Sequence, residues 1–295
     1  MDIDIDTDTN TNIDMETDND NKLMLKEEIN TQVDKPSFGK VIYHLNDMTI
    51  YQSEQSNDVD ADVDTDADAE SKLYEFSIHV TLDDYNKRFW DTFSAKILPE
   101  IHPKKAVPKT MNDVRNGKTI ITFYAERVRS LQKKLEKNSK QLHYEQGAAL
   151  LFHAITAVKN LEESGFGIVC FDITDFIVIN KDFFLFINSN KVIELEKNNL
   201  VINEPIQKGE FPSPELNAMN SVPYKLPMQS SYFSLASFIG TVITGNRIQL
   251  NDMEGKTYSD EAVEPFIRDI YYTKVYWALK RCLDVDYNKR VLTIV

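Results

Sequence analysis

The spacing of apolar residues changes along this chain, and this change limits the folds open to it. Leu73–Leu82 (LYEFSIHVTL) alternates with a period of two, which places Phe76, Ile78 and Val80 on one face of a strand. Leu142–Ser164 instead carries apolar residues spaced by three and four, as an amphipathic helix does. The sequence therefore predicts an α+β chain with its sheet first and its helices afterwards.

The part before residue 125 is expected to be mainly antiparallel sheet. Asn116-Gly117 separates two strand-like runs, Met111–Arg115 and Lys118–Tyr124. This dipeptide is the strongest short-range signal for a β-hairpin. One helix is expected over Asp83–Leu98, where a proline follows. Two further short strands are expected, at Lys40–Tyr43 and Met48–Tyr51.

The part after the long helix reads as a small strand pair followed by more helices. Gly165 stands where the long helix should end. A loop of mixed polarity is expected to lead to Phe211. The remaining expected elements are strands at Ile177–Ile179 and Phe183–Ile187, a helix over Phe233–Thr244 ending at Gly245, and a last helix from roughly Pro265 to Leu283.

The formal net charge of −14 comes largely from two acidic low-complexity runs, one at the start of the chain and one between Ser56 and Lys72. Such runs repel themselves and bury too little apolar surface to become ordered. We therefore expect a disordered tail over 1–33 and a disordered insertion over 54–72. An acidic chain is poorly suited to nucleic acid, and its acidic segments are suited to contacting basic protein partners.

The two cysteines, Cys170 and Cys282, are too few for a disulfide framework or a metal cluster, which favours a reducing compartment. No apolar run approaches the roughly 20 residues of a membrane helix, and the first residues lack the pattern of a signal peptide. The expectation is a soluble, intracellular protein without a membrane partner.

Several partial motifs occur in the order in which protein kinases carry theirs, and the chain resembles that family over about Ser37–Arg290. Ser37-Phe38-Gly39 resembles the end of a glycine-rich loop, and Ile168–Asp172 resembles a catalytic loop. The other matching segments are Phe76–His79, Thr122–Ala125, Phe186–Asn190, Ser213-Pro214-Glu215, Ser231–Ala236, and Cys282-Leu283 with Asp286 and Arg290.

This resemblance implies a bilobal kinase-like fold within the α+β class. Residues 34–124 would form an N-terminal lobe that is mainly antiparallel sheet with one helix, interrupted by the insertion at 54–72. Residues 125–295 would form a mainly helical C-terminal lobe.

The resemblance also assigns roles to individual residues. Asp172 stands at the position of the catalytic base, with Cys170 and Phe171 where His and Arg are usual. Asn188 replaces the metal-binding Asp, and Asp175 is the one remaining candidate for a second metal ligand. The positions that would line a nucleotide pocket are Gly39, Val41, His79, Thr122, Tyr124 and Ala125.

The residues at catalytic and ligand-binding positions depart from the family pattern more than the residues at positions that stabilise the fold. His79 stands where a phosphate-binding Lys is usual, and we interpret it as a strand residue on the solvent side. Phe171 is expected to pack against the segment that follows Asn188. Glu215 and Arg290, in contrast, match a buried ion pair that anchors that segment in kinases.

Two hypotheses follow. The leading one is a catalytically impaired kinase-like protein, a pseudokinase, that acts as a binding or scaffolding module without a cofactor. The alternative is a weak, atypical Ser/Thr kinase that uses Asp172 as its base together with ATP and Mg²⁺.

Overall fold

The computed structural model describes residues 39–46, 48–53, 73–81, 87–92, 109–113, 118–248 and 260–293. The tail expected over 1–33, the insertion expected over 54–72, the pair Ser37-Phe38 and the turn at Asn116-Gly117 lie outside the described residues. Everything below concerns the described ranges.

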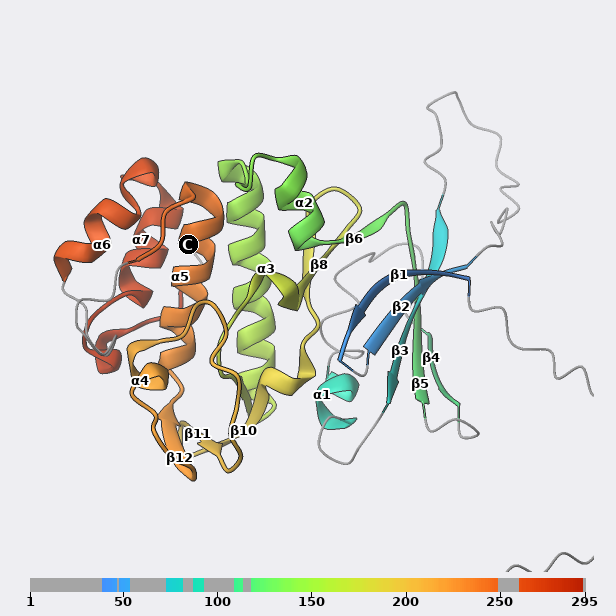
Figure 1. The fold of residues 1–295 in the computed structure, drawn as a ribbon, viewed down its shortest axis with the longest axis horizontal. Helices are drawn as coiled ribbons and strands as arrows, with labels where there is room; N and C mark the ends of the chain where they lie inside the picture. The colour runs from blue at the N-terminus through green and yellow to red at the C-terminus, as the bar shows by residue number, and fades with distance from the viewer. Residues whose placement is uncertain are drawn as a thin grey trace, which may run out of the picture. The chain divides into compact units, whose positions relative to one another are not determined.

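Five strands form the N-terminal sheet, which Figure 1 shows as neighbouring arrows. Their order is β1-β2-β3-β5-β4, and every neighbouring pair is antiparallel. The expected hairpin is present, since β4 pairs with β5. The bounds are β1 Lys40–Leu45, β2 Met48–Gln52, β3 Tyr74–Thr81, β4 Lys109–Asp113 and β5 Lys118–Ala125.

One face of this sheet belongs to the main apolar core. Ile78 pairs with Ile121 and Phe76 pairs with Phe123, and all four side chains are buried. Because strand side chains alternate between faces, His79, Thr122 and Tyr124 lie on the opposite face. The same core contains residues of the helices, so sheet and helices share one continuous apolar interior.

A short helix follows β3. The described part of the helix expected over Asp83–Leu98 is α1, Lys87–Thr92. Phe89 and Trp90 of α1 are buried and join the main core, whereas Asp91 is exposed. This helix is therefore held by aromatic packing.

The long helix α3, Tyr144–Glu163, is the central element after the sheet. It buries residues spaced by three and four, among them Leu150, Ala154, Val158 and Leu161. Gly165 follows the helix with a φ of +85°, a conformation that favours glycine. The shorter helix α2, Leu131–Lys137, precedes it and is capped by the Ser130 side chain.

Two small sheets lie beside these helices. Strand β8, Phe176–Ile179, pairs with β9, Phe183–Phe186, as expected, and with β6, Val128–Ser130. The second sheet has the order β12-β11-β10-β7. Its bounds are β7 Phe166–Ile168, β10 Val192–Glu196, β11 Asn199–Ile202 and β12 Tyr224–Pro227.

The second small sheet corrects the sequence prediction, which expected only loop between β9 and Phe211. Strands β10 and β11 form a hairpin there, joined by Lys197 and Asn198, both with positive φ. A two-residue turn with both central residues in this conformation matches the twist of a hairpin. The segment after Asn188 is therefore paired backbone in the described structure.

The helices near the end of the chain are α4 Pro214–Asn217, α5 Ser230–Thr244, α6 Asp260–Phe266 and α7 Lys274–Cys282. Helix α5 ends at Gly245, whose φ is +74°, as the sequence predicts. The single helix expected over Pro265–Leu283 is wrong. The chain leaves α6 after Phe266 and starts α7 anew at Thr273, whose hydroxyl accepts a hydrogen bond from the Tyr276 N–H.

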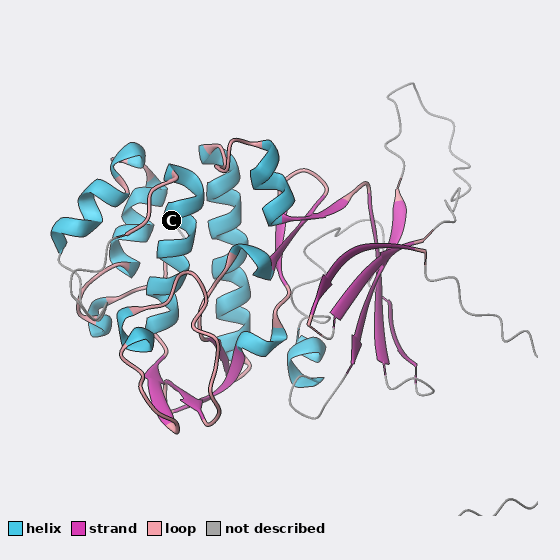
Figure 2. Cartoon of the chain, viewed as in Figure 1, coloured by secondary structure: helices cyan, strands magenta, loops and turns pink. Residues whose placement is uncertain are grey.

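The α+β class is thus observed, with antiparallel sheets and several helices (Figure 2). Among the helices in the described ranges, none has the length and apolarity required to cross a lipid bilayer.

Candidate functional site

The loop between β7 and β8 contains two carboxylates in a single turn. Asp172 precedes the one-turn helix Ile173–Asp175, and the two acids cap each other. The Asp172 N–H donates to Asp175 Oδ2 over 2.7 Å, and the Asp175 N–H donates to the Asp172 carbonyl over 3.1 Å. The first bond fixes the Asp175 side chain relative to the backbone, and the second closes the turn.

Lys191 bridges the two carboxylates. It follows β9 on the turn Ser189–Lys191. Its Nζ lies 2.8 Å from Asp175 Oδ2 and also donates to Asp172 Oδ2. The Lys191 and Asp172 side chains are only 12% and 15% exposed, and that of Asp175 is 1% exposed. We call these three residues the lysine-bridged centre.

Asn188 completes the contacts of Asp175. Its Nδ2 donates to Asp175 Oδ1 over 2.7 Å, while its Oδ1 accepts a longer 3.4 Å bond from Asn46 Nδ2 in the β1–β2 connection. Tyr43 of β1 donates through its hydroxyl to the Thr174 carbonyl over 2.6 Å. The N-terminal sheet is thus hydrogen-bonded directly to the loop that holds the two acids.

The second carboxylate oxygen of Asp172 is also engaged. Asp172 Oδ1 accepts the backbone N–H of Glu210, and Gly209 lies against the same carboxylate. A Cβ built on Gly209 would stand 2.5 Å from Asp172 Oδ2, and its φ is +70°. Only glycine fits both the space and the backbone conformation at this point. The segment that contains Gly209 therefore packs directly on the side chain at the expected base position.

Phe171 anchors the same segment from the other side. Its backbone forms an isolated antiparallel bridge with Phe211, and Ser234 of α5 accepts from the Phe171 N–H and donates to the Phe211 carbonyl. The Phe171 side chain is fully buried among the rings of Phe176 and Phe186. Phe171 is therefore joined to this segment through its backbone, whereas its side chain contacts the rings of Phe176 in β8 and Phe186 in β9.

Burial and charge act together on the ionisable groups of the centre. Burial raises the pKa of the Asp175 carboxyl, and the donors Lys191 and Asn188 oppose that increase. Burial lowers the pKa of the Lys191 ammonium, but Asp175, Cys170 and Asp172 together raise it, so its net shift is upward. Burial raises the pKa of the neighbouring Cys170 thiol to about 12, which keeps it protonated at neutral pH.

A polar cavity of about 470 Å³ opens beside the centre. Its walls come from residues 45–46, from the turn after Asp172, from the turn before β10 and from residues 204–207. The side chains of Thr174, Asn190 and Lys191 line it together with both aspartates and Asn188. In the described ranges, no group of three His, Cys, Asp or Glu side chains is arranged to hold a metal ion.

The expected nucleotide-pocket residues do not all lie on one face of the sheet. Val41, His79, Thr122 and Tyr124 lie on the face of the sheet away from the core, whereas Ala125 is buried in the core. Phe76, Ile78 and Val80 occupy the core face of β3, as the alternation of this strand predicts, so the position that the resemblance gives to His79 falls on the other face.

Gly39 stands directly before the first strand, where the resemblance places it. It precedes β1 and lies against the Gln52 carbonyl at the end of β2, so it is outside the β1–β2 connection. Leu45 pairs with Met48, so that connection consists of residues 46 and 47 alone.

His79 is a strand residue on the face away from the core, as interpreted from the sequence, but it is not exposed to solvent. The His79 side chain is 5% exposed, although it lies on the outer face of the sheet. Its ring stands 4.6 Å from the Tyr51 ring, and Nε2 is 3.0 Å from Ser77 Oγ. His79 is therefore a packed, hydrogen-bonded residue of the sheet.

Glu215 and Arg290 form the expected ion pair across 75 residues of sequence. Arg290 donates through both terminal nitrogens to the two carboxylate oxygens of Glu215, each over 2.9 Å. The Arg290 side chain is fully buried and lies over the Phe233 ring. This fork-like geometry is the strongest form of such a pair.

Lys191 is the central residue that the sequence interpretation missed. The sequence feature that could have indicated Lys191 is the polar turn Ser189-Asn190-Lys191 between two apolar strands. The segment that resembles a metal-binding turn ends at Asn190, one residue before Lys191.

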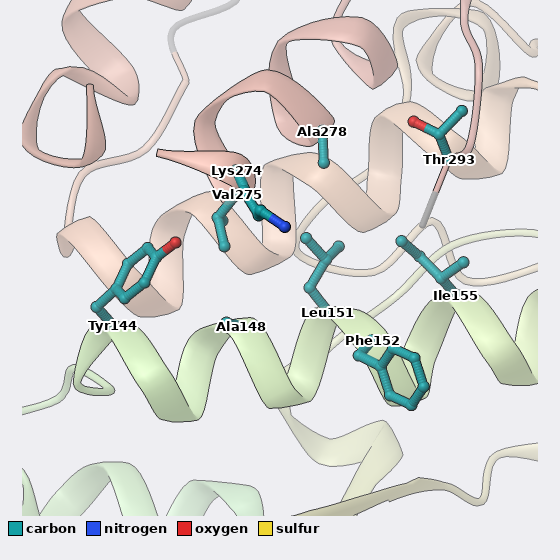
Figure 3. A pocket seen from close by; sticks show the side chains of 9 residues that line it. All are labelled: Tyr144, Ala148, Leu151, Phe152, Ile155, Lys274, Val275, Ala278 and Thr293. Atoms are coloured by element: carbon teal, nitrogen blue, oxygen red, sulfur yellow. The ribbon is translucent and has the colours of Figure 1, made fainter. Parts of the chain in front are cut away.

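A second cavity is apolar and separate from this chemistry. It has a volume of about 140 Å³ and lies between α3 and α7. Figure 3 shows Tyr144, Leu151 and Ile155 of α3 pointing toward the side where α7 presents Val275 and Ala278. Lys274, Tyr144 and Thr293 supply the few polar atoms among the residues that line it, so the cavity is not a set of converging catalytic groups.

Comparisons with known proteins do not assign this chain to a family. No protein-family model matches it, and no curated protein matches it in sequence.

Proposed function

We propose that this chain is a kinase-like module whose catalytic centre serves as a structural lock, and that it acts by binding or scaffolding rather than by phosphoryl transfer. In this proposal, residues 34–124 and 125–295 correspond to the two lobes of a kinase-like fold. The acidic segments outside the described residues would contact basic protein partners.

The order of elements supports the kinase-like part of the proposal. A five-stranded antiparallel sheet with one short helix precedes a long helix, a loop with Asp172, a strand pair and a helical remainder. The Glu215–Arg290 pair has the partners and the burial that the resemblance implies. These features are supplied by distant parts of the sequence, so their joint occurrence is more specific than any one motif.

The contacts of Asp172 carry the functional part of the proposal. A general base needs a free carboxylate oxygen within reach of the hydroxyl group whose proton it removes. One oxygen of Asp172 accepts from Lys191, the other accepts from the Glu210 N–H, and Gly209 covers the side chain. Asp172 is therefore occupied in holding the chain together.

The positions that would hold a nucleotide also support a protein without phosphoryl-transfer activity. Strand β3, with the sequence YEFSIHVT, supplies no lysine or arginine. The Glu126 N–H, next to the segment that resembles an adenine-binding hinge, donates to Asn180 Oδ1 over 2.7 Å.

Thermal unfolding with ATP, in the presence and absence of Mg²⁺, tests this proposal. A ligand that binds only the folded state adds about 2.7 kcal/mol of stability at 100 times its dissociation constant. We expect no change of the melting temperature with ATP, with Mg²⁺ or with both. A Mg²⁺-dependent shift by ATP would instead support the alternative, a weak Ser/Thr kinase using Asp172, and would call for a phosphoryl-transfer assay.

A further inference from the structure

We infer that the Lys191 ammonium takes the place of a divalent cation in this centre and thereby excludes metal from it. The inference rests on the proposed function, because the kinase resemblance is what implies a metal beside Asp175 and Asn188. The described residues do not fit that metal, because the Lys191 side chain occupies the position between the carboxylates.

The position of Lys191 is the first argument. Its Nζ contacts Asp172 Oδ2 and Asp175 Oδ2 together, so one positive charge joins two carboxylates from the same turn. A divalent cation bound by these acids would need the same oxygens at about 2.0–2.6 Å. The ammonium and the metal therefore compete for the same space and the same ligands.

Charge balance is the second argument. The centre contains two aspartates, one lysine and the neutral Asn188, and all four side chains are largely buried. A metal added beside the ammonium would place like charges close together in a site with little water to screen them. The lysine leaves only one negative charge to be compensated by hydrogen bonds from Asn188 and from the backbone N–H groups of Asp172 and Glu210.

Tethering is the third argument. Lys191 reaches the acids from the turn Ser189–Lys191, which is closed by the hydrogen bond from its own N–H to the Asn188 carbonyl over 3.2 Å. The cation is thus part of the chain and needs no free ion in solution. It follows that the centre is assembled in the absence of metal.

Removal of the ammonium should convert the centre into a metal site. In Lys191→Met the side chain keeps a similar length but loses its charge, which leaves two buried aspartates without their counter-ion. Carboxylate and amide oxygens are the ligands that Mg²⁺, Mn²⁺ and Ca²⁺ prefer. The variant should therefore be less stable than the wild type and should regain stability when such a cation is added.

The experiment is thermal unfolding of the full chain at matched ionic strength, with a chelator or with Mg²⁺, Mn²⁺ or Ca²⁺ and without nucleotide. We expect the wild type not to respond to the metal, and Lys191→Met to gain at least about 2 °C with one or more of the three ions. Lys208→Met is the matched control, because Lys208 is also partly buried but donates to the carbonyls of Asn217 and Met219. It should lose stability without a metal response.

Lys191→Arg keeps the inference testable if Lys191→Met does not fold in the chelator. Arginine keeps the positive charge of the side chain, so Lys191→Arg should fold and should be insensitive to metal. An unfolded Lys191→Met protein should refold when metal is added, which circular dichroism would detect. The inference is overturned if Lys191→Met never responds to metal, if Lys191→Arg responds, or if the wild type responds to metal alone. A response of the wild type to ATP with Mg²⁺, but not to Mg²⁺ alone, would overturn the proposed function instead.

Discussion

At the scale of single residues, the candidate site is defined by two carboxylates whose four oxygens all accept hydrogen bonds from the protein. Each carboxylate oxygen of Asp172 and Asp175 accepts at least one hydrogen bond from Lys191, Asn188 or a backbone N–H. Groups that perform proton transfer are usually left free to meet a substrate. The geometry of this centre is that of a cross-link between the Asp172 turn, the Lys191 turn and the Gly209 segment.

Gly209→Ala should destabilise the protein through this cross-link. A non-glycine residue at a φ of +70° costs roughly 1–3 kcal/mol, and the added Cβ would also press on the Asp172 carboxylate. The unfolding free energy from urea titration should fall by at least that amount. In an Asp172→Ala background the cost of Gly209→Ala should become smaller but not vanish, because only the steric part is relieved. An equal cost in both backgrounds would show that the two residues are not in contact.

Single residues were predictable where the resemblance named both partners of an interaction. Glu215 and Arg290 could be paired because both ends of the pair match the pattern. Lys191 could not be found this way, because its partners lie 16 and 19 residues earlier and no motif position corresponds to it. The contact is created by the fold alone.

At the scale of elements, local periodicity identified the long segments and failed where polar and apolar residues mix. Helices α3 and α5 and the β8–β9 pair have strong patterns and clear ends. Strand β10, VIELE, alternates buried residues with exposed glutamates, and Lys197-Asn198 is a less familiar turn than Asn-Gly. The break between α6 and α7 is not predictable from periodicity, because the residue that marks the start of α7 in the sequence is only the N-cap Thr273.

The core face of β3 is predictable from its alternation, because Phe76, Ile78 and Val80 are apolar and the residues between them are polar. The alternation does not show whether the polar face is itself covered by neighbouring side chains. His79 illustrates this, since it is buried on the outer face beside Tyr51.

The junction of α3 with β9 should make the protein sensitive to mild acid. Burial lowers the pKa of His153, although a hydrogen bond to the Ala149 carbonyl opposes this, and its ring packs against Phe183. The unfolded chain then binds more protons than the folded chain below the ordinary histidine pKa of about 6.5. The contribution of His153 to stability is therefore present above that pH and is lost as the pH falls below it.

Comparison of His153→Leu with the wild type isolates this effect. The wild type should lose more unfolding free energy between pH 7 and pH 5 than His153→Leu does. His143→Leu, which alters an exposed histidine one residue before α3, is the control and should keep the wild-type slope. Identical slopes for all three proteins would contradict the assignment.

At the scale of the whole molecule, contacts between distant segments hold the fold together. Tyr43 and Asn46 connect the N-terminal sheet to the loop after β7 and to Asn188, and Arg290 connects the end of the described chain to Glu215 of α4. The α+β class and the element order were accessible from the sequence, because they depend on local patterns. The connections depend on which side chains meet in space.

Glu215→Ala should lower the melting temperature clearly. The change leaves the buried Arg290 guanidinium without its carboxylate, and losing one partner of a buried pair costs roughly 3–5 kcal/mol. Glu196→Ala is the control, because its pair with Lys225 is about two-thirds exposed and is expected to contribute at most about 1 kcal/mol. Equal melting curves for Glu215→Ala and the wild type would remove the ion pair from the list of stabilising contacts.

The measurement that tests the central claim most directly is the unfolding free energy of Asp172→Asn. If Asp172 is a structural lock, loss of its charge weakens the bond to Lys191 and should lower stability by roughly 1.5–3 kcal/mol. Asp269→Asn, a change of an exposed aspartate, should have little effect. If Asp172 is instead a catalytic base, Asp172→Asn should be as stable as the wild type and should lose a measurable phosphoryl-transfer activity. That result would contradict the assignment of Asp172 as a structural lock.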